Sequence, residues 1–266
     1  MNALLVASRT GGPDKGGWGP IGRLEHADGV YRFIYTKGAK SLEGFRPFHG
    51  MDDLTRIYES DDLFPVFMNR LLPESRPEYE AYLRWSGFDA DNPPDPISIL
   101  GVTEGIRQTD SIELFPCPVP NLDGCYINKF FLHGLRWMPP AAKERISELK
   151  EGDQLYLMPD LFNQVDPHAV ALRTGDEGRF LIGYVPRYLA NDLWTLFGKC
   201  DREHIQVIVH RINRDAPMQQ RLLCRMHACW PAGFEPCSDE SFDPIPEGVS
   251  AKCEPEFAEP LLCPRC

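Results

Sequence analysis

The sequence predicts an α+β protein, and three observations lead to this fold class. An Asp28-Gly29 turn separates two β-prone runs, which is typical of a hairpin. Apolar residues at helical spacing follow that hairpin. A second set of β-prone runs, separated by turn residues, occupies positions 155–184. We therefore expect a small sheet with helices, followed by a second unit made mostly of strands.

A proline-rich segment separates these two parts. Residues 116–120 have the sequence Pro-Cys-Pro-Val-Pro, which removes backbone donors from both helix and sheet. We therefore predict domains at 1–118 and 119–232. The remaining residues, 233–266, are acidic, contain cysteines and are poor in aliphatic side chains. Such a composition predicts a loosely ordered tail.

The first domain shows a hairpin and then helices. Its predicted elements are strands at 21–24 and 30–35, a helix at 63–72 ended by Pro73, a helix at 75–86 ended by Gly87, and apolar runs at 97–102 and 111–115. On the first helix, Phe67, Leu71 and Leu72 form an apolar face that we expect in the core.

The second domain shows three short strands and a shaped loop. Strands are predicted at 155–158, 169–172 and 180–184, and the last two are separated by a Gly-Asp-Glu-Gly turn. The loop at 163–168, Asn-Gln-Val-Asp-Pro-His, contains side chains that can bond to their own backbone. A helix is expected at 188–197.

Composition excludes several classes of protein. The chain has 266 residues, 42% hydrophobic and 25% charged, which is typical of a soluble globular protein. No run approaches 18 apolar residues, and the N-terminus lacks a secretory signal, so we expect a cytoplasmic protein without a membrane partner. The nine cysteines are then predicted to be reduced thiols or metal ligands.

The charge distribution bears on nucleic-acid binding. The net charge is −11, and residues 119–232 are the least acidic part of the chain. Five arginines there could form a local patch: Arg202, Arg211, Arg214, Arg221 and Arg225. Any binding to DNA should be weak and sensitive to salt. No nucleophile elbow, zinc-protease helix, phosphate-binding loop or Rossmann glycine set occurs, so we expect no enzymatic activity.

Three motifs in the second half together resemble the HIRAN domain over residues 123–230. They are Gly134-Leu135-Arg136-Trp137, the loop with Asn163 and Asp166, and Gly183-Tyr184-Val185-Pro186-Arg187. The resemblance implies a mostly β barrel with flanking helices that binds the 3′ end of single-stranded DNA. It assigns DNA contacts to Arg136, Trp137, Asn163, Asp166, Tyr184 and Arg187. Val165 departs from the pattern, because DNA-binding members have an aromatic residue there.

Each of these residues also has a structural interpretation. Trp137 and Tyr184 could be core rings with a polar edge. Asp166, which precedes Pro167, could cap a turn. Arg136 could be a solvated surface charge, and Arg187 could pair with Asp192 on the following helix.

Residues 1–118 resemble the N-terminal subdomain of HipA-type toxin kinases. The motifs are Gly22-Arg23-Leu24, the Phe33-x-Tyr35 strand, and the run from Asn69 through Arg70 to Pro73-Glu74. The resemblance implies docking on a separate HipA-like kinase protein, through Asn69, Arg70 and Pro73. It does not extend to the kinase body, whose catalytic residues are missing here.

The last cysteines allow one cofactor hypothesis. Cys263 and Cys266 form a Cys-x-x-Cys pair, and Cys253 lies upstream. Thiolates suit zinc, but a zinc ribbon needs two tight pairs. We therefore expect no cofactor, with structural zinc as the lesser alternative.

Two functions follow from these resemblances. The first is a bacterial, non-catalytic regulator, an antitoxin-like component of a toxin–antitoxin system, that binds a HipA-type kinase and single-stranded DNA 3′ ends. The alternative is a stand-alone DNA-end-binding module in DNA repair or phage defence.

Overall fold

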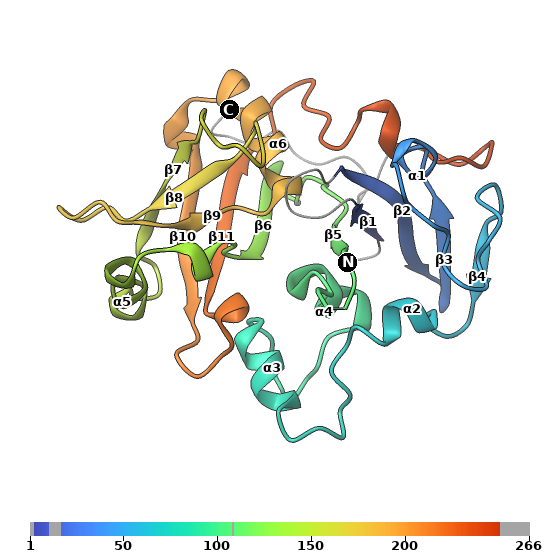
Figure 1. Ribbon diagram of the computed structural model, residues 1–266, viewed down its shortest axis with the longest axis horizontal. Coiled ribbons are helices and arrows are strands. Elements are labelled where there is room, and N and C mark those ends of the chain that lie inside the picture. The colour runs from blue at the N-terminus through green and yellow to red at the C-terminus, as the bar shows by residue number, and fades with distance from the viewer. Residues whose placement is uncertain (1–2, 11–16, 108, 251–266) are drawn as a thin grey trace. The chain divides into compact units, whose positions relative to one another are not determined.

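The computed structural model describes residues 3–10, 17–107 and 109–250. Within these ranges the chain forms two compact units, each assembled from separate segments of sequence (Figure 1). Unit 1 contains residues up to 79, 94–119 and 235–250, and unit 2 contains residues 80–93 and 120–234.

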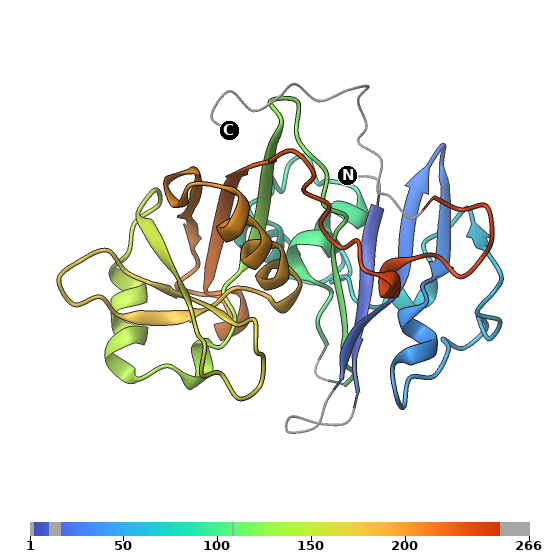
Figure 2. The ribbon, with the colours of Figure 1, turned by 90° about the horizontal axis from the view of Figure 1, so that it is seen from above.

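Unit 1 is built on an antiparallel sheet of order β4-β3-β2-β1-β5 (Figure 2). Its strands are β1 (Ala3–Arg9), β2 (Trp18–Ala27), β3 (Val30–Tyr35), β4 (Tyr58–Ser60) and β5 (Ile112–Pro116). Its helices are α1 (Gly38–Ser41), α2 (Pro65–Met68), α4 (Pro96–Thr103) and the 3₁₀ turn η4 (Glu240–Phe242). Packed rings of Phe33, Tyr35, Phe48 and Phe67 lie at the centre of its core.

Turn chemistry explains the hairpin of unit 1, and prolines shorten its helices. Asp28 and Gly29 have φ angles of 52° and 78°, as the predicted tight turn requires. The predicted helix at 63–72 is wrong in length: only α2 forms, because Pro65 forces Phe64 into an extended conformation. Phe67 is fully buried, as expected.

The second predicted helix is also shorter. Only α3 (Tyr79–Trp85) forms from residues 75–86. Pro77 disfavours helical geometry at the residue before it, which delays the start. Gly87, at φ 75°, ends the helix as predicted.

Unit 2 contains an antiparallel six-stranded sheet of order β6-β11-β10-β7-β8-β9. The strands are β6 (Cys125–Phe131), β7 (Gln154–Pro159), β8 (Val170–Arg173), β9 (Leu181–Tyr184), β10 (Ile205–Ile212) and β11 (Leu222–Cys229). The helices are α5 (Pro140–Glu148), α6 (Arg187–Lys199) and the 3₁₀ turns η1 (Leu135–Trp137), η2 (Arg202–His204) and η3 (Met218–Gln220). The three predicted strands and the predicted α6 helix are confirmed.

A bridge between the two edge regions curls this sheet into a half-barrel. His133, just after β6, exchanges backbone hydrogen bonds of 2.9 and 3.0 Å with Tyr184 at the end of β9. Gly183 makes this approach possible, because a Cβ there would lie 2.5 Å from the His133 carbonyl oxygen. The fold is therefore mixed α and β, with a curled sheet where the barrel was expected.

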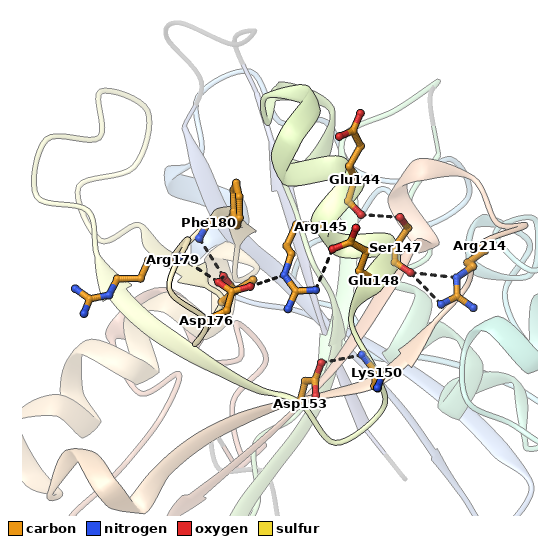
Figure 3. Close-up of polar contacts among 11 residues, drawn as sticks. Glu144, Arg145, Ser147, Glu148, Lys150, Asp153, Asp176, Arg179, Phe180 and Arg214 are labelled. Carbon is orange, nitrogen blue, oxygen red and sulfur yellow. Dashed lines mark hydrogen bonds and ion pairs between the residues drawn. The ribbon is translucent and has the colours of Figure 1, made fainter.

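Helix α5 is joined to the β8–β9 hairpin by a polar network (Figure 3). Arg145 on α5 forms an ion pair with Asp176 in the hairpin turn. Asp176 also accepts hydrogen bonds from the Thr174 hydroxyl at 2.7 Å and from the backbone N–H of Arg179 at 3.1 Å. These contacts hold the pKa of Asp176 below its usual range, through the Thr174 hydroxyl first and Arg145 second.

Two segments pack differently from their expected places. Residues 80–93, assigned by sequence to the first domain, pack in unit 2, where Asn213 donates a 2.9 Å hydrogen bond to the Trp85 carbonyl. Residues 235–250, expected to be loosely ordered, pack in unit 1. There Ile245 donates its N–H to the Tyr35 carbonyl at 2.9 Å and Phe242 is buried.

The cysteines depart in part from the expectation of reduced thiols. Cys125, Cys200, Cys224, Cys229 and Cys237 are thiols rather than disulfides, whereas Cys117 is disulfide-bonded. No cluster of three or more metal-ligating side chains occurs in the part of the chain that the structure describes. The zinc candidates Cys253, Cys263 and Cys266 lie outside that part. Among the described helices, none is long and apolar enough to cross a membrane.

Candidate functional site

The loop between β7 and β8 in unit 2 is closed by its own backbone. Asp160 donates its N–H to the Ala169 carbonyl at 2.9 Å, and Ala169 donates its N–H to the Asp166 carbonyl at 3.0 Å. These bonds fix both ends of the loop at the end of the β7–β8 ladder. The side chains between them are therefore presented at a rigid sheet edge.

Asn163 shapes the interior of the loop. Its Oδ1 accepts hydrogen bonds from the backbone N–H groups of Val165 and Asp166, both at 3.0 Å. Its Nδ2 donates to Asp160 Oδ2 at 3.1 Å. Both ends of the amide are thus engaged in holding the loop, which is the local side-chain bonding expected of such a residue.

Asp160 connects the loop to strand β9. Its Oδ2 accepts a 3.0 Å hydrogen bond from the Tyr184 hydroxyl. The Asn163 amide and then the Tyr184 hydroxyl hold the pKa of Asp160 below its usual range. Burial, with the neighbouring Asp160 charge, raises the pKa of Tyr184. The pair therefore stays an ionised acceptor and a neutral donor over the physiological pH range.

Asp166 and Arg187 form the charged part of the site. Asp166 Oδ1 accepts the N–H of His168 at 3.0 Å, which is the turn-capping role considered from sequence. Asp166 Oδ2 lies 3.6 Å from Arg187 Nε. Asp192, the other partner considered for Arg187 from sequence, is buried and accepts a 2.9 Å hydrogen bond from the Tyr126 hydroxyl. Both partners of the Asp166–Arg187 pair keep partial contact with solvent, at 16% and 24% exposure.

Arg136 and Trp137 are presented by the η1 turn. Gly134 begins this turn at φ 76°, and a Cβ at Gly134 would lie 3.2 Å from the Tyr184 ring. The turn therefore lies beside Tyr184. Trp137 is 75% exposed, so its interpretation as a core ring is wrong. The Arg136 guanidinium lies over the Trp137 ring at 4.7 Å, a cation–π contact that holds the indole near a positive charge.

One aromatic residue of the loop was missed by sequence reasoning. Phe162 is 93% exposed, and the neighbouring Leu161 and Val165 are 71% and 66% exposed. The signal for this residue was a Phe in a loop between two strands. Aromatic side chains are usually buried, so a ring placed in a surface loop indicates a binding role. The loop and η1 thus carry two solvent-exposed rings, Trp137 and Phe162. The same elements and the start of α6 carry two carboxylates, Asp160 and Asp166, and two guanidinium groups, Arg136 and Arg187. This combination suits a ligand that has flat rings, a hydroxyl group and anionic groups.

The residues predicted to bind a protein partner lie elsewhere, in unit 1. Asn69 and Pro73 are exposed. Arg70 is buried, and its guanidinium donates to the Gly105 carbonyl at 2.8 Å and pairs with Asp110 at 2.6 Å. The hydrogen bonds of Arg70 therefore serve unit 1 itself.

Comparison with known proteins identifies the region around the loop. Residues 128–227 match the family model of the HIRAN domain, which confirms the predicted resemblance for this part of the chain. The match lies within unit 2 and gives no support to the HipA resemblance of residues 1–118. No curated protein sequence matches this chain.

Two solved structures are similar to parts of the chain. The HIRAN domain of human HLTF is 16% identical over 40% of this chain and 75% of its own, with a TM-score of 0.29. A protein from Lactobacillus plantarum is 20% identical over 39% of this chain and 96% of its own, with a TM-score of 0.30.

Proposed function

We propose that unit 2 is a non-catalytic module that binds the 3′ end of single-stranded DNA. The observation that carries this proposal is that Tyr184 bonds to Asp160 of the β7–β8 loop and lies beside Gly134 of the η1 turn. These two elements carry Asp166, which pairs with Arg187, and the exposed rings of Phe162 and Trp137. The HIRAN match of residues 128–227 supports it.

Each group has a role that follows from its chemistry. The Asp166 carboxylate has acceptor capacity beyond its bond to His168, so it accepts a hydrogen bond from the terminal 3′-hydroxyl. Arg187 and Arg136 meet phosphate oxygens, which guanidinium groups bind bidentately. Trp137 and Phe162 stack on bases, a contact worth roughly 1–3 kcal/mol per base that does not depend on sequence. Asn163 and Asp160 are positioning residues, because their hydrogen bonds hold the loop.

Phe162 supplies an aromatic ring that the HIRAN pattern places at position 165, where this chain has Val. The resemblance places an aromatic residue at position 165, where this chain has an exposed Val. Phe162, three residues earlier in the same loop, supplies an exposed ring in its place. We therefore assign the second stacking contact to Phe162.

The test is fluorescence anisotropy with short single strands at low salt, since the protein is acidic. Three probes are compared: a strand with a 3′-hydroxyl, the same strand with a 3′-phosphate, and an internally labelled circle. We expect selective binding of the 3′-hydroxyl strand, and loss of that selectivity in Asp166→Asn, which can keep the turn bond to His168 but removes the charge. Equal binding of all three probes by the wild type would contradict end recognition.

Matched variants separate specific contacts from general charge. Asp123→Asn removes an exposed carboxylate elsewhere in unit 2 and should leave end selectivity intact. Phe162→Leu keeps apolar bulk in the loop but removes the aromatic face. A loss of about tenfold or more in Phe162→Leu would be consistent with stacking of roughly 1–3 kcal/mol. Unchanged affinity would exclude Phe162 as a base contact.

The regulator function remains a prediction from sequence. No observation in unit 1 favours a kinase partner, and Arg70 is committed to contacts within that unit. The proposed function is therefore the stand-alone DNA-end-binding module, without a kinase or antitoxin role.

A further inference from the structure

A cluster of positive charge lies on one face of the β6-β11-β10 part of the unit 2 sheet. Lys129 on β6 is directly opposite Arg225 on β11 in the antiparallel register. His210 and Arg211 lie at the bulge of β10, where Arg211 is opposite Leu223 of β11. We refer to these four residues as the cationic cluster. It is separate from the β7–β8 loop in sequence and uses none of its residues.

The ladder geometry brings Lys129 and Arg225 close together. Backbone hydrogen bonds from Trp230 to Gly124 and from Leu132 to Leu222 lie at the two ends of the β6–β11 pair. Hydrogen-bonded and non-hydrogen-bonded residue pairs alternate along an antiparallel ladder. Because Gly124 and Leu132 belong to hydrogen-bonded pairs, the odd-numbered Lys129 forms a non-hydrogen-bonded pair with Arg225. In such pairs the Cα atoms are only about 4.5 Å apart, and the side chains are at their closest.

His210 shares the same face. A Cβ at Gly87 would lie 3.1 Å from His210 Nε2 and 3.2 Å from Leu223 Cδ2, which places the imidazole beside Leu223. Leu223 is two residues from Arg225 on the same strand, so both side chains project from one side of the sheet. The imidazole is therefore next to the Lys129–Arg225 pair.

The charges of Lys129, Arg211 and Arg225 repel one another and disfavour protonation of His210. Burial, followed by the charges of Arg225 and Arg211, lowers the pKa of Lys129. Burial, followed by Lys129, Arg211 and Arg225, lowers the pKa of His210, and Glu151 is the acidic group that acts against this effect. Like charges directly opposite in a ladder are destabilising. The arrangement therefore costs stability in the unliganded protein.

No described carboxylate forms an ion pair with these four residues, and the charge of Glu151 acts only on His210. The ion pairs between described residues of unit 2 use Arg84, Arg145 and Arg187 as their cations. None of them includes a member of the cationic cluster, and no described side chain forms a hydrogen bond with the four groups. Of the five arginines considered from sequence as a patch, only Arg211 and Arg225 belong to it. Arg214 and Arg221 donate to backbone carbonyls instead.

We propose that Lys129, His210, Arg211 and Arg225 form a second binding site, for a ligand that carries two or more adjacent phosphate groups. Partly buried cations are normally paired, so a cluster that forms no ion pair with any described residue favours an added anionic ligand. The cluster spans two inter-strand spacings, about 10 Å, which is wider than one phosphate. Two guanidinium groups and an ammonium group suit phosphate oxygens. The ligand is a nucleic-acid backbone or a nucleoside polyphosphate.

The first test is titration calorimetry of the full chain with two probes. One is inorganic tripolyphosphate, and the other is oligothymidylate with a 3′-phosphate, which the proposed 3′-hydroxyl site should not select. The variants are Lys129→Met, Arg225→Gln and the control Arg202→Gln, which removes an exposed charge from η2. We expect at least about tenfold weaker binding in the first two, as the loss of a charge-assisted contact implies. The control should bind as the wild type does.

The two probes distinguish the sources of phosphate. Tighter binding of tripolyphosphate would identify a nucleoside polyphosphate, and tighter binding of the oligonucleotide would identify a nucleic-acid backbone. The Asp166→Asn variant should still bind whichever of the two probes the wild type binds. This result would separate the inference from the proposed end recognition. If neither probe binds the wild type, the inference is wrong.

Thermal unfolding of the free protein gives an independent readout. Removing one of several mutually repelling charges should raise the melting temperature of Lys129→Met or leave it unchanged. Tripolyphosphate should raise the melting temperature of the wild type more than that of this variant, because a ligand stabilises the state that it binds. Two results together would contradict the inference: a lower melting temperature of ligand-free Lys129→Met, and no effect of tripolyphosphate on the wild type. They would show that the chain itself compensates the charge of Lys129.

Discussion

Tyr184 donates its hydroxyl hydrogen bond to Asp160, and through this bond strand β9 holds the loop that follows β7. The same Tyr184 exchanges two backbone hydrogen bonds with His133, which closes the half-barrel. One residue therefore sets both the curvature of the sheet and the position of the candidate site. Four predictions follow from this arrangement and its surroundings.

Tyr184→Phe should loosen the loop without opening the sheet. The variant keeps the ring and the backbone bridge to His133 but removes the donor to Asp160. We expect a loss of about 0.5–1.5 kcal/mol in unfolding free energy, the usual net worth of one hydrogen bond. Amide hydrogen exchange should become faster for Val165 and Asp166. If exchange there is unchanged, the Asp160–Tyr184 bond does not hold the loop.

Gly183→Ala should disturb the closure itself. Gly183 has φ 153°, and a Cβ there would lie 2.5 Å from the His133 carbonyl oxygen. Because backbone atoms cannot move aside cheaply, we expect a marked loss of stability in urea unfolding and loss of the proposed DNA-end binding. Gly152→Ala is the control: it also has positive φ, at 88°, but its Cβ would meet nothing within 4 Å. Equal losses in both variants would show that only the backbone angle matters.

Acid should weaken the loop through Asp160. Its folded pKa is lowered by Asn163 and then Tyr184, and the unfolded value is about 3.9. Because the pKa of Asp160 is lower in the folded protein than in the unfolded chain, ionised Asp160 stabilises the fold fully at pH values above its unfolded pKa. This stabilisation is lost as the pH falls through the folded pKa. Urea unfolding between pH 5 and pH 2 should therefore show a steeper loss for the wild type than for Asp160→Asn. Parallel curves would contradict this assignment.

Asn213→Ala should release residues 80–93 from unit 2. The Asn213 side chain is buried and donates to the carbonyls of Trp85 at 2.9 Å and Gln220 at 2.7 Å. Its removal leaves two part-buried carbonyl groups without this donor, and the usual net worth of one such hydrogen bond is about 0.5–1.5 kcal/mol. Limited proteolysis should then cut within residues 80–93 faster than in the wild type. Asn191→Ala, an exposed position on α6, is the control and should cleave as the wild type does.

Elements that depend on neighbouring residues could be predicted from the amino-acid sequence. The Asp28-Gly29 hairpin, the strands on either side of the β7–β8 loop and helix α6 follow from turn residues and local periodicity. The HIRAN motifs also placed the loop and η1 correctly in one unit. Where prolines competed with apolar periodicity, at Pro65 and Pro77, the predicted helices were too long.

Contacts between distant segments could not be predicted from local sequence patterns. Residues 80–93 join unit 2 through long-range hydrogen bonds to Asn213 and Asp215, which no local pattern encodes. The exposure of Phe162 and Trp137 depends on what the rest of the chain leaves uncovered. The cationic cluster exists because strand register places Lys129 opposite Arg225, nearly a hundred residues away. Local chemistry determines elements, but register and burial depend on free energies summed over the whole fold.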